Sequence, residues 1–89
     1  MNKYLYFGAP WCGPCRMMKP MLDKLPTEIV LERYNIDNSS ELVEKYGVMK
    51  VPTTILVDKE GTELNRIVGS TTQTRLEKTW NDYDTNRIF

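Results

Sequence analysis

Two cysteines, Cys12 and Cys15, lie at a junction between two different hydrophobic patterns. Residues 3–8 are rich in aromatics and almost entirely apolar, which is typical of a short strand covered on both faces. From Cys15 onward, apolar residues recur at the spacing of a helix, at Met17, Met18, Met21, Leu22 and Leu25. The pattern therefore predicts that the pair lies at a strand-to-helix turn, with Cys12 at or before the first helical turn.

This placement suits reactive thiols. Free backbone N–H groups and the positive end of the helix dipole both favour a thiolate at a helix N-terminus. As a structural staple the pair is poor, because a disulfide that closes so short a loop removes little entropy from the unfolded chain. A zinc site needs four ligands, and the chain has no third cysteine and no histidine, so a metal would have to be shared between two chains. We therefore expect no bound metal. We expect instead that Cys12 and Cys15 form and break a disulfide repeatedly.

Length and composition exclude several classes of protein. With 89 residues, 40% of them apolar and 27% charged, the chain is predicted to form one domain, residues 1–89, with a real core. Twelve basic and twelve acidic residues cancel, so nothing predicts electrostatic binding to nucleic acid or to a membrane. No apolar run approaches the ~18–20 residues of a membrane helix. The absence of histidine excludes imidazole metal sites and histidine-dependent acid–base catalysis.

The first residues do not resemble a secretion signal. Residues 4–11 imitate the apolar part of a signal peptide, but a single lysine precedes them. The cysteine pair follows where small residues would be needed for cleavage. We therefore expect a cytoplasmic protein that is complete from Met1.

Strand-like and helix-like segments alternate along the rest of the chain. Strands are predicted at 28–37, 51–57 and 62–68, a short helix before Gly47, and a last helix at about 72–83. Asn38 and Glu41 are interpreted as a capping box for the short helix, and Gly47 as its left-handed cap. Residues 59–61 form a predicted hairpin turn, whereas the tail from Asp84 shows no periodicity and is expected to lack regular structure.

The predicted order is βαβ-αββα. The first crossover makes two strands parallel, and the short turn makes the last two antiparallel. The expected architecture is therefore α/β, with a mixed sheet and helices on both faces.

Several short motifs together resemble the thioredoxin family. The resemblance begins with WCGPCR at residues 11–16 and with Pro20 inside the following helix. It continues in family order through YNID at 34–37, KYGV at 45–48, VPT at 51–53 and VG at 68–69. Across residues 3–80 it implies a minimal thioredoxin fold, a four-stranded sheet in the order 2-1-3-4 flanked by three helices. It also implies a cis peptide bond before Pro52, with that loop packed against the two sulfurs.

The resemblance implies a dithiol–disulfide oxidoreductase that reduces protein disulfides. Cys12 would be the exposed nucleophile with a lowered pKa, and Cys15 the buried resolving thiol. A shallow apolar groove for the substrate would be lined by Trp11, Gly13, Pro14, Val51, Pro52 and Gly69. No bound cofactor is implied, and electrons are expected from a flavin-dependent thioredoxin reductase that uses NADPH. We expect a monomer in electron transport and cell redox homeostasis.

Three departures from the family pattern concern the site. No strand and helix precede the active-site strand, as in glutaredoxins. The buried Asp usual six residues before the first Cys is replaced by Tyr6, and the Lys usually beside it by Arg33. The Trp that is common four residues before the first Cys is replaced by Gly8.

Tyr6 and Arg33, together with Lys50 near Pro52, are candidate modulators of the pKa of the thiols. A phenol cannot accept a proton near neutral pH, so Tyr6 is not expected to replace the carboxylate as a base.

Other side chains have plain structural interpretations. Met17, Met18 and Met21 are interpreted as core residues rather than as a partner-binding patch. Trp80 is interpreted as an aromatic anchor of the core. Trp11 abuts the first thiol at a loop edge, so a substrate-facing role is favoured.

Two alternative functions stay open. A glutaredoxin-like protein fed by glutathione is favoured by the short N-terminus. It is disfavoured by the Gly-Pro between the cysteines and by the absence, at residues 68–72, of the Gly-Gly-acidic segment of glutaredoxins. The other alternative is a thioredoxin-fold binding subunit that clamps a larger partner. Such a clamp would need neither cysteine. The sequence also does not distinguish a reductant from an isomerase.

Overall fold

The structure is a computed structural model that describes residues 1–84. Its elements are β1 (Lys3–Gly8), α1 (Gly13–Asp23), β2 (Leu31–Asn35), the 3-10 turn η1 (Ile36–Asn38), α2 (Ser40–Tyr46), β3 (Thr53–Val57), β4 (Glu63–Val68) and α3 (Gln73–Asp82). The expectation for the tail after Asp84 lies outside the described residues. In the part of the chain that is described, no helix has the length and hydropathy needed to span a membrane.

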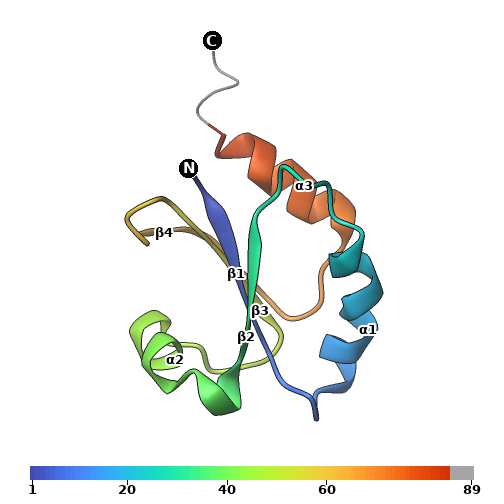
Figure 1. Cartoon of the computed structure of the whole chain (residues 1–89), viewed down its shortest axis with the longest axis vertical. Coiled ribbons are helices and arrows are strands. Elements are labelled where there is room, and N and C mark those ends of the chain that lie inside the picture. The colour runs from blue at the N-terminus through green and yellow to red at the C-terminus, as the bar shows by residue number, and fades with distance from the viewer. Residues whose placement is uncertain (85–89) are drawn as a thin grey trace.

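The four strands form one mixed sheet in the order β2-β1-β3-β4. β1 pairs in parallel with β2 and antiparallel with β3, and β3 pairs antiparallel with β4. Figure 1 shows α1 and α3 on one side of this sheet and α2 on the other. The element order, the strand order and the three helices all confirm the predicted fold.

The apolar run in β1 serves both faces of the sheet. Tyr4 and Tyr6 lie in the core cluster that includes Leu22 of α1 and Leu76 of α3. Leu5 and the fully buried Phe7 belong to a second cluster, against which side chains of α2 pack. Alternate residues of a strand point to opposite faces, so a central strand covered on both sides must be apolar at every position.

The second strand is shorter than predicted. Strand β2 covers only Leu31–Asn35, and the next three residues form the turn η1. The Asn35 side chain accepts a hydrogen bond from the Asp37 backbone N–H at 2.9 Å, which is the local interaction that turns the chain out of the strand.

The predicted capping box is wrong, although the end of the same helix is confirmed. Asn38 is the last residue of η1, and α2 begins after Ser39 without a side-chain cap. Gly47 ends α2 in the left-handed conformation with φ of 60°, and its N–H donates to the carbonyl of Glu44.

The hairpin between β3 and β4 is confirmed and has a clear local cause. One carboxylate oxygen of Asp58 accepts hydrogen bonds from the backbone N–H groups of Glu60 and Thr62, each at 2.9 Å. The Gly61 N–H donates to the Asp58 carbonyl at 2.9 Å. Because Thr62 is held in the turn, β4 starts one residue later than predicted.

One side chain predicted to be buried by helical spacing lies at the surface. Met17 is 83% exposed, so the prediction of a core role is wrong for this methionine, while Met18 is buried and Met21 packs at the core edge. Tyr83 follows the last turn of α3 and is also exposed. Trp80 packs against Tyr4 with ring centroids 5.7 Å apart, which makes it an anchor at the edge of the core.

Candidate active site

The two cysteines form a disulfide at the N-terminus of α1, as predicted. Cys12 is the N-cap residue in extended conformation, and its Sγ accepts a hydrogen bond from the Cys15 backbone N–H at 3.2 Å. Pro14 occupies the first turn, where a missing N–H costs nothing. The same backbone donor and the helix dipole are therefore in place to stabilise a thiolate on Cys12 after reduction.

The expected difference in exposure between the two cysteines is absent in the disulfide. Cys12 is 5% exposed and Cys15 is 8% exposed, so the prediction of an exposed Cys12 is wrong for this state. Both cysteines cluster with Ala9, and the half-buried Ile36 and Val51 pack against them. The feature that distinguishes Cys12 is thus its N-cap hydrogen bond rather than its accessibility.

The loop before β3 closes over one side of the disulfide. The peptide bond between Val51 and Pro52 is cis, as the family resemblance implies, and Val51 packs against the cysteine cluster. The Pro52 carbonyl accepts a hydrogen bond from the Gly69 N–H at 2.8 Å. This hydrogen bond links the end of β4 to the loop. Gly69 has a φ of 93°, a backbone conformation that favours glycine.

Trp11 and the same loop border a hollow of about 340 Å³. Trp11 is 62% exposed, and its Nε1 donates to a carboxylate oxygen of Asp37 at 3.1 Å, which holds the indole beside the disulfide. The hollow is lined by Trp11, Ile36, Val48, Met49, Lys50 and Val51. This arrangement fits the predicted substrate-facing role of Trp11.

Only part of the predicted groove coincides with this hollow. Trp11 and Val51 line it, whereas Gly13 and Pro14 belong to the first turn of α1. The remaining predicted pair, Pro52 and Gly69, joins the loop to β4 through the hydrogen bond between them.

The sequence did not assign Ile36, Val48 and Met49 of this lining to the site, nor Asp37, which contacts Trp11. Met49 is 93% exposed and apolar, and Asp37 fixes the indole. The position of Met49, three residues before the cis proline, was the signal that could have indicated it. Lys50 lines this hollow too.

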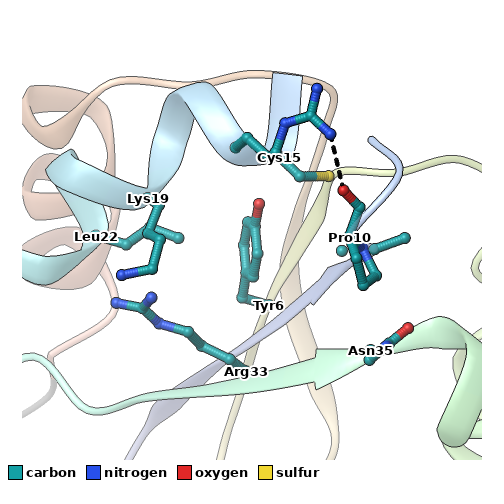
Figure 2. Close-up of a pocket in the computed structure, with 10 residues that line it drawn as sticks. Tyr6, Pro10, Cys15, Lys19, Leu22, Arg33 and Asn35 are labelled. Carbon is teal, nitrogen blue, oxygen red and sulfur yellow. Dashed lines mark hydrogen bonds between the residues drawn. The ribbon is translucent and has the colours of Figure 1, made fainter. Parts of the chain in front are cut away.

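A second hollow, of about 240 Å³, lies on the other side of Cys15, between α1 and the strands β1 and β2 (Figure 2). Tyr6 stands at its floor, 6% exposed, and its buried hydroxyl has no hydrogen-bond partner among the described residues. Burial raises the pKa of Tyr6 above its usual value, and the nearby charge of Arg33 opposes that rise only in part. Tyr6 is therefore a neutral phenol at neutral pH and does not act as a base.

Arg33 reaches the end of α1. It pairs with Tyr6 in the β1–β2 register, and its guanidinium forms an ion pair with Asp23 at 2.6 Å. Lys19 also contacts Asp23, at 3.1 Å. Hydrogen bonds from Arg33, and to a smaller extent from Lys19, hold the pKa of the Asp23 carboxyl below its usual value.

Arg33→Gln is expected to raise the pKa of Asp23 towards its usual value. A carboxyl with a lowered pKa contributes stability above its unfolded pKa and loses it as the pH falls through the folded pKa. The substitution should therefore flatten the loss of stability in acid. An NMR titration of the Asp23 carboxyl tests this, with Lys19→Gln as the matched control that should shift it less. A larger shift in the Lys19 variant would contradict the assignment.

Known proteins match this chain across both the sheet and the disulfide. The family model described as Thioredoxin matches residues 3–82. A thioredoxin of Porphyra purpurea is 35% identical over 81 residues, which cover 86% of this chain and 75% of that protein. A thioredoxin of Chlamydia caviae is 44% identical over 66 residues, covering 71% of this chain and 64% of that protein. Among solved structures, a mutant thioredoxin from Halobacterium salinarum NRC-1 superposes with a TM-score of 0.84 at 30% identity, covering 92% of this chain and 74% of that one.

Proposed function

The chain belongs to the thioredoxin family and is a thioredoxin-type dithiol–disulfide oxidoreductase, and from this premise we propose that it reduces disulfides of other proteins. In this proposal the electrons come from a flavin-dependent thioredoxin reductase that uses NADPH. The observation that carries the proposal is the disulfide at the N-terminus of α1 with the exposed Trp11 beside it. In this proposal the protein acts as a monomer in the cytoplasm and carries electrons on its two sulfurs alone, without a bound cofactor.

The proposed cycle transfers two electrons through a mixed disulfide. The Cys12 thiolate attacks one sulfur of the substrate disulfide, and the other substrate sulfur leaves as a thiolate. The Cys15 thiolate then attacks Cys12 Sγ, which releases the second substrate thiolate and leaves the Cys12–Cys15 disulfide. The reductase returns two electrons from NADPH to restore both thiols.

The hollow beside Trp11 supports a protein substrate rather than a small one. Its border carries exposed apolar side chains, Trp11 and Met49, and Val51 connects it to the sulfurs. An extended segment of a substrate could lie along this border and pair with backbone groups near Val51. Large apolar and aromatic contacts of this kind contribute most of the affinity at protein interfaces.

The source of electrons is tested by insulin reduction with two separate supplies. We expect much faster turnover with thioredoxin reductase and NADPH than with glutathione, because residues 68–72 lack the Gly-Gly-acidic segment of glutaredoxins. A variant with both cysteines replaced by serine provides the background rate. Equal or faster turnover with glutathione would place the chain with the glutaredoxins. Turnover at the background rate with both supplies would favour the binding-subunit alternative.

A further inference from the structure

Two buried tyrosines lie two residues apart on β1 and face the same core cluster, but their hydroxyls differ. The Tyr4 hydroxyl donates to the Leu76 carbonyl at 2.7 Å. The Tyr6 hydroxyl is equally buried and has no partner within residues 1–84. Leaving a buried polar group unpaired costs free energy, so such a group in a well-packed core calls for a physical reason.

The unpaired hydroxyl shares a hollow with the resolving cysteine. Tyr6 and Cys15 both line the 240 Å³ hollow, with Gly8 between them. A Cβ atom on Gly8 would lie 3.0 Å from Tyr6 Cε2 and 3.4 Å from Cys15 Sγ, so the phenol ring and the sulfur border the same small space. Figure 2 shows the Tyr6 ring rising from β1 with its hydroxyl directed towards α1, the helix that carries Cys15.

The charged groups around this hollow favour a negative charge on Cys15. Arg16 and Lys19 of α1 and Arg33 of β2 line it, and Asp23 is engaged by Lys19 and Arg33. The Arg16 guanidinium also donates to the Pro10 carbonyl at 3.0 Å, the hydrogen bond that is dashed in Figure 2. On the opposite side of the cysteines the neighbouring side chains, Ile36 and Val51, are apolar.

We propose that Tyr6 is a positioning residue for the resolving step, in which its hydroxyl donates a hydrogen bond to a water in this hollow and the water donates to the Cys15 thiolate. The hollow has room for water, three basic side chains line it, and the Tyr6 ring lines it with the hydroxyl buried just beneath its surface. The inference rests on the dithiol–disulfide chemistry of the pair and does not depend on which reductase supplies the electrons.

The proton and the electrons balance without an acid or base from the protein. In the mixed disulfide the Cys15 thiol loses its proton to solvent through the mouth of the hollow. The thiolate attacks Cys12 Sγ, the bond between Cys12 and the substrate sulfur breaks, and the substrate leaves as a thiolate. Tyr6 keeps its own proton throughout and serves only as a donor, which is consistent with its raised pKa.

This role explains why no protein group in residues 1–84 pairs with the Tyr6 hydroxyl. A sulfur in a disulfide carries no charge and accepts hydrogen bonds only weakly, whereas a thiolate accepts them strongly. The water beside the Tyr6 hydroxyl therefore gains a strong acceptor only when Cys15 ionises. An interaction that is made in the reacting state and not in the resting state lowers the barrier of that step.

The test compares Tyr6→Phe with Tyr4→Phe, a matched pair in which each variant loses one buried hydroxyl from β1. Reduced protein is mixed rapidly with a chromogenic aromatic disulfide that releases one coloured thiolate when Cys12 attacks and a second when Cys15 resolves. Both phases are followed from about pH 6 to about pH 9, which spans the usual pKa of a thiol. This probe needs neither a reductase nor a protein substrate, so its outcome is independent of the proposed function.

We expect Tyr6→Phe to slow the second phase about tenfold at low pH, because the loss of a hydrogen bond to a thiolate raises its pKa by about one unit. The rates of Tyr6→Phe and wild type should converge at high pH, and the first phase should be unchanged. Oxidised Tyr6→Phe should unfold at the same denaturant concentration as wild type or higher. Tyr4→Phe should unfold at a lower concentration, because it loses the hydrogen bond from the Tyr4 hydroxyl to the Leu76 carbonyl, but should keep the wild-type pH profile.

Three results would overturn the proposal. The first is a Tyr6→Phe profile that superimposes on that of wild type. The second is a second phase that is slower by the same factor at every pH, which would indicate a packing effect. The third is an equal shift in Tyr4→Phe, which would indicate a general response of the core to loss of a hydroxyl.

Discussion

Cys15→Ser should trap the protein on its substrate as a stable mixed disulfide through Cys12. The nucleophile is expected to stay active in this variant, because Cys12 Sγ is held by the backbone N–H of residue 15 rather than by its side chain. The resolving sulfur is lost, so multiple turnover of insulin should fall by about a thousandfold or more, the order seen when an essential nucleophile is removed. Non-reducing electrophoresis and mass spectrometry would detect the adduct.

The matched control is Cys12→Ser, which should form no adduct. In this variant the thiol that stays, Cys15, lies inside the first turn of α1. The α1 N-cap position, where the backbone N–H favours a thiolate, is then occupied by a hydroxyl. Efficient trapping through Cys15 in the Cys12→Ser variant would reverse the assigned order of the two thiols.

Phe7→Ala is expected to lower the free energy of unfolding by about 3–5 kcal/mol, the usual cost of removing a fully buried aromatic ring. Phe7 has no exposed surface, and its ring stacks on Tyr34 with centroids 5.7 Å apart and lies 6.5 Å from the ring of Tyr46. A domain of this kind is stabilised by only about 5–15 kcal/mol in total, so the substitution should remove a large share of the stability.

Urea denaturation of the oxidised protein measures this effect. Val68→Ala is the matched control on the same sheet, because Val68 is 55% exposed and its truncation should cost less than about 1 kcal/mol. If Phe7→Ala lost no more than Val68→Ala, the cluster between the sheet and α2 would not be the stabilising core assigned to it.

The order of the elements could be predicted from the sequence because the signals act over a few residues. The change from a strand pattern to a helix pattern placed Cys12 at the start of α1, and Gly47 ended α2 as expected. The strand order 2-1-3-4 and the cis bond before Pro52 came from the family resemblance, since no local pattern indicates them.

Local signals also failed where two of them competed. Asn38 and Glu41 have the spacing of a capping box. The Asn35 side chain instead accepts a hydrogen bond from the Asp37 N–H and forms a separate turn, so that Ser39 becomes the N-cap residue of α2. Met17 fits the apolar spacing of a helix, but it lies on the exposed side of α1. A spacing identifies a helix, while the surface against which the helix packs decides which residues are buried.

The sequence by itself determined the chemistry of this protein, because two thiols at a helix start can perform dithiol–disulfide exchange wherever the helix is placed. Only the tertiary structure decided how each thiol is surrounded. It brought Asp37 to Trp11, Asp23 to Arg33, and the unpaired hydroxyl of Tyr6 into the hollow beside Cys15. These contacts join residues on different elements, so they arise from the packing of the helices against the sheet and leave no periodic trace along the chain.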